Sequence, residues 1–365
     1  MMTEIKLRLN PLFRIQLSNQ PDNTIIIELF LEEKSLKIND VNFLKIISFA
    51  KEGTNIFELS SFISKEFDLK IEEAEKIVFD LIEKKFLVTN EYKKEEMESV
   101  RHWVERGWLD ALILHLSIKN MTYADDNVEN LHDENDKYFK ELLKKERFPS
   151  IFKKYPNYPL IKLPDPLPLP QDRSFEEILL SRRSHRPWSN NVFQLEELST
   201  ILKNASYETK RLRDLVQENI EKKPSVLMNA SFSALEIYFF SHDVEGIKNG
   251  LYFYDLKEHG IVLLKKGDFR EAVAKMCIGQ KSAGSGAITF IISCLWNRYM
   301  FRYRHPMGYR TILINTSELA QKLLILCTAF GKSTFLTPAF NDEQAEKLLD
   351  VFNLEEAPLY VVAAG

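Results

Sequence analysis

The sequence SRRSHRPWSNNVFQLEELSTIL, residues 181–202, decides how the rest of the chain is interpreted. It holds three arginines within five residues, Arg182, Arg183 and Arg186, with the hydroxyl of Ser184 between them. Guanidinium groups beside a hydroxyl are suited to hold a phosphate monoester through charge-assisted hydrogen bonds. The same pattern is also typical of a solvated basic turn, and the residues alone leave both interpretations open.

The segment lies in a chain of 365 residues that is 45% hydrophobic and 28% charged. This composition provides for two or three domains with cores and excludes a wholly disordered chain. The formal net charge is −4, so the chain has no overall positive field for nucleic acid or for an anionic membrane. With only 12 Gly, glycine-rich phosphate loops are disfavoured as well.

The cysteines Cys277, Cys294 and Cys327 lie far apart in apolar surroundings, which predicts buried thiols in a reducing compartment. The seven His have no metal-binding spacing, so no metal site is expected. No signal sequence opens the chain, and no uninterrupted apolar run reaches the ~18 residues of a membrane span. We therefore expect a cytoplasmic protein that binds neither nucleic acid nor a membrane.

Residues 1–92 are expected to form a winged-helix domain. A β-rich run at 24–31 precedes three amphipathic helices, the last over 71–85, and a further strand begins at 86–88. The third helix is strongly acidic and would repel DNA, so a peptide is the more suitable partner.

Residues 93–170 are expected to be a helical linker that ends in an extended spacer. Six of the 14 prolines fall within 156–170, and this density of proline excludes a helix there. Beyond the spacer, β-rich runs alternate with helices. The predicted fold class is therefore α+β, with a second domain over 171–365.

The quoted segment resembles the RRSxRxF…LxxEELxxLL opening of the flavin-dependent nitroreductase-like family. Later stretches are similar to successive blocks of its SagB/McbC branch, the azoline dehydrogenases of peptide natural-product clusters: GLYFYD at 250–255, RYRHPMGYR at 302–310, ELAQKLLILCTAFG at 318–331 and EAPLYVVAAG at 356–365. This resemblance covers 171–365. Less sharply, residues 1–170 resemble the winged-helix and helical extension of the cyanobactin-type oxidases.

The resemblance implies a nitroreductase-like domain that forms a homodimer with FMN at the subunit interface. The residues implied to hold FMN are Arg182, Arg183, Ser184, Arg186, Asn229, Ser231, Arg310, Thr337, Pro338 and Ala339. Residues 337–339 would pass the flavin N5 and O4 edge, where the family supplies backbone N–H donors. Pro338 has no N–H, so one such donor is expected to be missing.

The resemblance also implies that Arg302 and Tyr303 are catalytic, at the place where azoline dehydrogenases have Lys-Tyr. Oxidation of an azoline requires a base, and an arginine does not release its proton, so Tyr303 would have to accept one. In the reverse direction, Tyr303 would protonate the α-carbon of a dehydroamino acid while Arg302 stabilises negative charge on the carbonyl oxygen. A structural role for Arg302 is the alternative.

We therefore expect an FMN-dependent oxidoreductase that modifies a ribosomally synthesised precursor peptide. The favoured reaction is reduction of dehydroalanine or dehydrobutyrine to D-amino acids in a lanthipeptide, with NAD(P)H as electron donor. The alternative is dehydrogenation of thiazoline or oxazoline to thiazole or oxazole, with O2 as acceptor. A small-molecule nitro or quinone reductase and a non-catalytic scaffold are the other classes. The leader peptide would bind to residues 1–92, with structural packing of this unit against the catalytic domain as the alternative, and other modification enzymes are expected partners.

Overall fold

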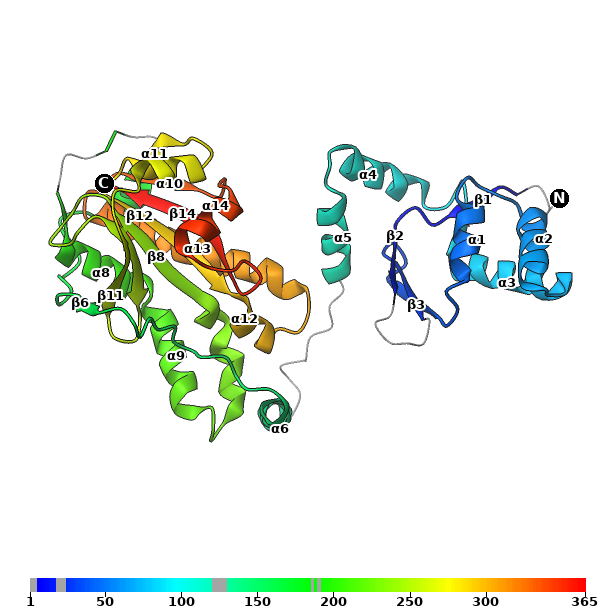
Figure 1. Cartoon of the computed structure of the whole chain (residues 1–365), viewed down its shortest axis with the longest axis horizontal. Coiled ribbons are helices and arrows are strands. Elements are labelled where there is room, and N and C mark those ends of the chain that lie inside the picture. Colours follow the sequence, from blue (N-terminus) through cyan, green and yellow to red (C-terminus); the bar gives the residue numbers. More distant parts are fainter. Residues whose placement is uncertain (1–4, 18–23, 120–129, 185–186, 189–191) are drawn as a thin grey trace. The chain divides into compact units, whose positions relative to one another are not determined.

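The computed structural model describes residues 5–17, 24–119, 130–184, 187–188 and 192–365, with the backbone alone at 132 and 229–233. Two compact units are present, Met1–Tyr123 and Ala124–Gly365, and each is considered by itself (Figure 1).

The N-terminal unit combines small antiparallel sheets with helices. Its strands are β1 (Leu7–Leu9), β2 (Phe13–Leu17), β3 (Ile25–Leu29), β4 (Lys34–Ile38) and β5 (Leu87–Thr89). Its helices are α1 (Phe43–Ala50), α2 (Ile56–Phe67), α3 (Ile71–Glu83), α4 (Lys94–Glu105) and α5 (Leu109–Ile118). One sheet has the order β2-β3-β4, and the other pairs β1 with β5.

The core of this unit forms because β3 alternates. Ile25, Ile27 and Leu29 point inward and pack with the buried faces of α1, α2 and α3. The β-rich run and the last of the three predicted helices are thus confirmed as β3 and α3. The strand β5 pairs with the distant β1 and is followed by α4, so the described residues contain no hairpin after α3. The winged-helix assignment of residues 1–92 stays a prediction.

The C-terminal unit is built on an antiparallel seven-stranded sheet. Its order is β13-β14-β12-β8-β10-β11-β6. The strands are β6 (Leu160–Lys162), β8 (Leu235–Ser241), β10 (Gly250–Asp255), β11 (Gly260–Lys266), β12 (Ile288–Leu295), β13 (Thr334–Thr337) and β14 (Glu356–Ala364). Two short strands of this unit, β7 (Phe193–Gln194) and β9 (Val244–Glu245), form a separate parallel pair.

Helices cover this sheet and connect its strands. They are α6 (Leu131–Lys145), α7 (Phe175–Ser181), α8 (Leu195–Ala205), α9 (Tyr207–Asn219), α10 (Arg270–Met276), α11 (Lys281–Gly284), α12 (Trp296–Arg302), α13 (Met307–Ala329), α14 (Asp342–Leu349) and the 3-10 helix η2 (Pro224–Ala234). The predicted α+β class is confirmed by this arrangement.

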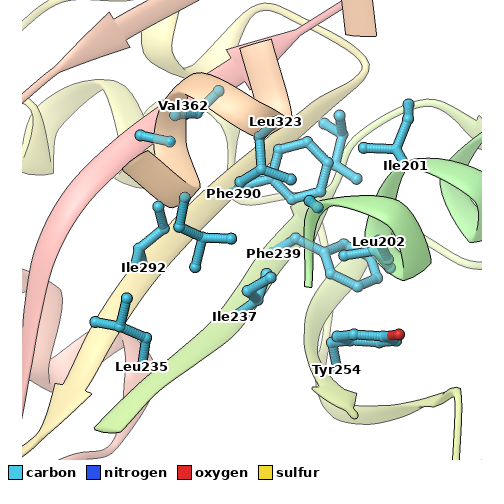
Figure 2. Packing of buried hydrophobic residues seen from close by; sticks show 14 of the residues in the cluster. Ile201, Leu202, Leu235, Ile237, Phe239, Tyr254, Phe290, Ile292, Leu323 and Val362 are labelled. Carbon is cyan, nitrogen blue, oxygen red and sulfur yellow. The ribbon is translucent and has the colours of Figure 1, made fainter. Parts of the chain in front are cut away.

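The sheet is buried on both faces, because its central strands β8 and β10 are buried at every position and most of their side chains are apolar. Ile237, Phe239 and Phe290 pack with α8 and α13 on one face (Figure 2). Tyr238 and Phe240 pack with α10, α11 and α14 on the other. The period of two in each strand therefore places a helical layer on each side.

The division between the two units differs from the expected boundary at residue 170. The proline-rich segment is extended as predicted, but it contains β6, which pairs with β11 as the outer strand of the sheet. Phe152 and Leu163 belong to the main core, and α6 buries Phe139 in a neighbouring cluster. The segment is therefore part of the C-terminal unit, because its apolar residues are needed to complete that core.

Helix α13 is long and apolar enough to cross a membrane by length and composition, the one such helix in the part of the chain that the structure describes. Half of its apolar window is buried, with Leu319, Leu323 and Cys327 facing the sheet. These contacts are those of a core helix. The prediction of buried thiols is confirmed, because Cys277, Cys294 and Cys327 are all buried and unpaired.

Candidate active site

The basic segment begins where α7 ends. At the start of this helix the Ser174 hydroxyl accepts a hydrogen bond from the N–H of Glu177, and the Glu177 carboxylate accepts one from the N–H of Ser174. At the other end, the N–H of Arg182 donates to the carbonyl of Ile178, and the backbone then becomes extended. Arg182 and Arg183 therefore follow the carboxyl end of α7 in extended backbone, where both line a cavity.

This space, here called the arginine cavity, has a volume of about 100 Å³. The residues that line it and carry polar side chains are Arg173, Ser181, Arg182, Arg183, Thr328, Lys332, Ser333 and Thr334. Two buried atoms in it, Arg182 Nη1 and Thr334 Oγ1, have no hydrogen-bond partner. Buried donors are rarely left unsatisfied, so each of these two atoms requires a bound water or a polar ligand.

The other cations of the cavity are already paired. Arg173 donates to the Thr328 carbonyl at 3.0 Å and to Ser181 Oγ. The Lys332 ammonium lies 2.9 Å from Glu197 and donates to the Val192 carbonyl. Arg182 is therefore the cation whose capacity is unused, and Arg173 holds the wall of the cavity in place.

The remaining arginines of the segment are placed as follows. Arg183 is exposed at the rim, where it donates to the Arg182 carbonyl. Ser184 is half-buried and does not line the cavity, and Arg186 lies outside the described residues. Arg310 is exposed on the first turns of α13 and lines neither the arginine cavity nor the aromatic cavity described below. The sequence pattern thus brings Arg182 and Arg183 to one space.

The segment expected at the flavin edge follows β13. Thr337 Oγ1 accepts the N–H of Ala339 at 3.0 Å, and Pro338 has no N–H. Gln280 Nε2 donates to Thr337 Oγ1 at 3.1 Å and to the Ala339 carbonyl at 3.0 Å. The backbone donors at residues 338 and 339 are therefore missing or engaged within the segment. Asn229 and Ser231 lie in η2, at positions for which the structure describes the backbone alone.

Arg302 and Tyr303 lie together at the end of α12. The guanidinium carbon of Arg302 is 4.8 Å from the centroid of the Tyr303 ring and 5.6 Å from that of Phe139. It thus lies over the ring face, and Arg302 Nε is buried without a hydrogen-bond partner. The arrangement leaves a charged donor beside a phenol, which is the pair needed to stabilise an oxyanion and to transfer a proton.

Beside Tyr303 lies a second space, here called the aromatic cavity, of about 320 Å³. Tyr303 stacks on Tyr299 with centroids 4.6 Å apart, and Trp296 stacks on Tyr309 at 5.9 Å. Burial raises the pKa of Tyr299 well above its usual value, so its phenol stays protonated. Gly308 packs closely against this pair, because a Cβ would stand 3.2 Å from Tyr303 Cβ and 3.3 Å from the Tyr299 ring.

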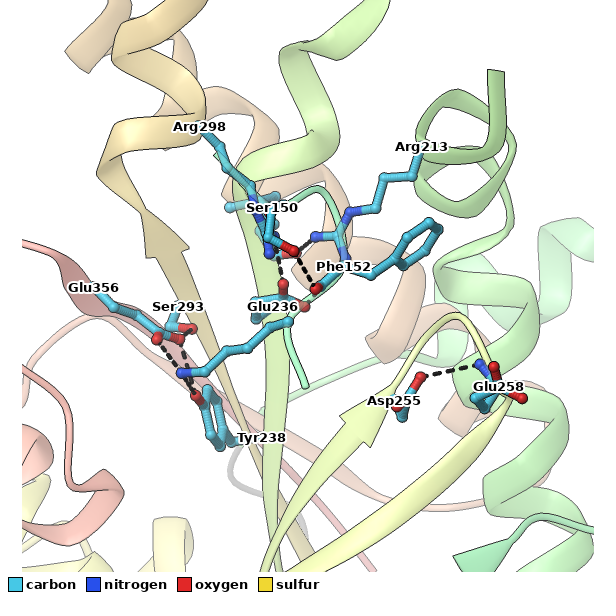
Figure 3. Close-up of polar contacts among 12 residues, drawn as sticks. Ser150, Phe152, Arg213, Glu236, Tyr238, Asp255, Glu258, Ser293, Arg298 and Glu356 are labelled. Carbon is cyan, nitrogen blue, oxygen red and sulfur yellow. Dashed lines mark hydrogen bonds and ion pairs between the residues drawn. The ribbon is translucent and has the colours of Figure 1, made fainter. Parts of the chain in front are cut away.

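A buried ionic network fixes the start of α12 (Figure 3). Glu236 pairs with Arg298 at 2.5 Å and with Arg213 at 3.3 Å, and each of these side chains is at most 3% exposed. Burial lowers the pKa of Arg213 to about 10, against the opposing effect of Glu236. A neighbouring group joins Lys153 to Glu356; burial alone would lower the pKa of Lys153, but the ion pair raises it.

Sequence inspection missed three residues of this region: Arg173, Gln280 and Thr334. Arg173 lies eight residues before Ser181, and Thr334 is far along the chain. Gln280 ends the α10–α11 connection, and nothing in its own sequence neighbourhood predicts its hydrogen bond to Thr337. No local signal marks any of them, because their roles depend on contacts between distant segments.

Comparison with known proteins identifies the family of this chain. The nitroreductase family matches residues 179–365, which is half of the chain. The chain belongs to the nitroreductase family. It is 30% identical over 98% of its length, and over 100% of the relative, to the trifolitoxin operon protein TfxC of Rhizobium leguminosarum bv. trifolii. It is also 27% identical over 56% of its length to MJ1384 of Methanocaldococcus jannaschii, named as a nitroreductase, covering 95% of that protein.

Among solved structures, a protein of Anabaena variabilis named as a nitroreductase is similar with a TM-score of 0.48 and 22% identity. The match covers 68% of this chain and 49% of that one. A chain of the E. coli microcin synthetase McbBCD complex with truncated pro-MccB17 bound is similar with a TM-score of 0.39 and 15% identity, over 67% of this chain and 84% of that one.

The expected family is thereby confirmed, and the relation to a protein of a toxin operon agrees with its SagB/McbC-type branch. By family, the chain is an FMN-dependent oxidoreductase.

Proposed function

We propose that this chain binds FMN with the phosphate in the arginine cavity. Arg182 Nη1 and Thr334 Oγ1 are buried there without partners, and a phosphate monoester would accept hydrogen bonds from both. Arg183 at the rim would add charge. When bound, FMN supplies a two-electron hydride exchange that protein side chains do not provide. The two unsatisfied atoms are the observation that carries this proposal.

The active form would be a homodimer. On α7, Phe175 and Leu180 are exposed, and on the contacting helix α13, Leu313 and Ile314 are exposed. A second copy that covers these neighbouring faces would remove large apolar side chains from water. Light scattering at micromolar concentration should therefore give twice the mass of the chain.

The favoured reaction is reduction of a dehydroalanine or dehydrobutyrine in a precursor peptide. NAD(P)H is the source of the hydride, which carries the electron pair. Hydride addition at the β-carbon leaves negative charge that is shared by the α-carbon and the adjacent carbonyl oxygen. Arg302 Nε, which has no partner, would donate to that oxygen, and Tyr303 would give its proton to the α-carbon. Arg302 stays protonated, so it stabilises the charge and takes no proton.

Oxidation of an azoline to an azole is the second candidate, favoured by the blocks that resemble the SagB/McbC branch. In that direction the ring would lose a proton to Tyr303 and a hydride to the bound flavin, and O2 would accept the electron pair from the flavin and leave as hydrogen peroxide. Arg302 over the Tyr303 ring would then stabilise the phenolate.

The substrate would be recognised outside the catalytic centre by the N-terminal unit. In the sheet β2-β3-β4, the strands β2 and β4 each have one unpaired edge. A leader peptide would add to such an edge as a further strand, with main-chain hydrogen bonds. The full-length similarity to a protein of a toxin operon supports a modified peptide as the product.

Two incubations, one anaerobic and one in oxygen, test whether the protein reduces or oxidises its peptide substrate. NADPH-reduced protein mixed with a dehydrated peptide should add two hydrogens, as detected by mass spectrometry, whereas an azoline peptide in oxygen should lose two only if the second candidate is right. Tyr303→Phe should abolish either reaction and keep the flavin content, while Tyr207→Phe, at an exposed site on α9, should change neither. Protein that stays colourless with added FMN would overturn the proposal.

A further inference from the structure

A large cleft lies at the start of α12, at the other end of this helix from Tyr303. It has a volume of about 640 Å³ and is lined mainly by residues 149–156, together with the start of α12 and the β10–β11 turn. We call it the lysine cleft, after Lys153, Lys154 and Lys257 in its lining. It is separate from the arginine cavity and from the aromatic cavity, because no residue is shared with either.

The backbone that lines this cleft has unused hydrogen-bonding groups. The Ser150 carbonyl accepts from Arg298, and the Phe152 carbonyl accepts from Ser150 Oγ at 2.8 Å. Within the described chain, the N–H groups of residues 151–154 donate to no protein group, and the carbonyls of Ile151 and Lys153 accept from none. This segment can therefore pair with the main chain of a peptide.

The charge of the cleft selects the kind of peptide. Arg298 and Lys153 are neutralised by Glu236 and Glu356. In contrast, Lys154 and Lys257 have no carboxylate within ion-pair distance in the described part of the chain. Lys257 instead lies over the Phe152 ring, 5.6 Å from its centroid. Glu355 is the only acidic residue in the lining. Glu258, outside the lining, is close enough to Lys154 and Lys257 for a weak electrostatic attraction, but it is already paired with Lys162 at 3.1 Å, so the cleft keeps an excess of positive charge.

The position of the cleft connects it to the chemistry. Arg298 lines the cleft from the start of α12, and Tyr303 follows the end of the same helix. Five residues of helix correspond to roughly 8 Å along its axis. A peptide held in the cleft would thus lie within a few residues of the candidate proton donor.

We propose that the lysine cleft binds an acidic segment of the peptide substrate, with carboxylates on Lys154 and Lys257 and the peptide main chain on residues 151–154. This inference rests on the proposed function, because it assigns the substrate of the same catalytic unit.

Fluorescence anisotropy with a fluorescein-labelled peptide of alternating Glu and Thr tests the inference on the full FMN-loaded chain. The double variant K154E/K257E should bind this peptide about tenfold more weakly or worse, and rising salt should weaken wild-type binding. The control K275E/K347E reverses two exposed lysines on α10 and α14, which lie on the other side of the sheet, and should bind like wild type. A peptide of alternating Lys and Thr should not bind.

Equal affinity of K154E/K257E and wild type, no binding by wild type, or equal binding of a single-stranded oligonucleotide would each overturn the inference. Thermal unfolding and flavin absorbance of each variant show whether the fold and the cofactor site are intact. If the acidic peptide binds as expected but no peptide is reduced or oxidised, the proposed function fails and the cleft assignment stands. If turnover is found while K154E/K257E binds the acidic peptide as wild type does, the cleft assignment fails and the proposed function stands.

Discussion

Replacement of Glu236 by Gln should destabilise the C-terminal unit more than any surface change. Gln keeps the shape of the side chain but removes the charge shared by Arg213 and Arg298. Both guanidinium groups are at most 3% exposed, so neither can recover its hydration. Breaking a buried pair in this way costs about 3–5 kcal/mol, a large part of a typical domain stability of about 5–15 kcal/mol.

Urea denaturation followed by the fluorescence of Trp188 and Trp296 would measure this loss. The matched control is Glu343→Gln, which removes an exposed pair with Lys347 and should leave the urea midpoint almost unchanged. Because Arg298 anchors α12, Glu236→Gln should also lower turnover in conditions where the protein is still folded. A loss below about 1 kcal/mol for Glu236→Gln would refute the view that the two arginines depend on this carboxylate.

Three further outcomes are expected. Arg182→Ala should lose most of its FMN on gel filtration while Arg211→Ala, at an exposed pair on α9, should keep it, and equal flavin absorbance would exclude the arginine cavity. Gly308→Ala should lower turnover, because its Cβ would displace Tyr303 by a few tenths of an ångström, while the better helix propensity of Ala offsets the cost in stability; unchanged kinetics would contradict this. His242 is buried, and burial lowers its pKa to about 4, so stability should fall as the pH drops from about 6.5 to 4; His242→Gln should flatten that part of the pH–stability curve.

The sheet of the C-terminal unit could be predicted because its strands are marked by β-rich runs that are mostly apolar. Such runs predict β8, β10, β11, β12 and the second half of β14, since a strand that is covered on both faces shows little polar alternation. The three-residue strand β6 was not predicted, because its residues are exposed and prolines surround it. Its pairing with β11 depends on a partner some hundred residues further along the chain.

The candidate site could be predicted only in its local part. Arg182 and Arg183 are adjacent in sequence, and so are Arg302 and Tyr303, so a motif identifies each pair. The partners that complete them come from elsewhere, as with Thr334 in the arginine cavity. Burial decides which cation is unused: Lys332 follows a glycine like a phosphate-binding lysine, yet Glu197 neutralises it.

The two edge strands of the seven-stranded sheet, β6 and β13, are flanked by prolines. β6 lies between Pro159 and Pro164, and β13 is followed at once by Pro338. A proline has no N–H to offer to an incoming strand, so each margin presents only a few residues to a neighbouring molecule. Without residues 156–170 the longer strand β11 would become the margin. A fragment starting at residue 171 should accordingly form fibrils or precipitate, whereas one starting at residue 124 should remain dispersed.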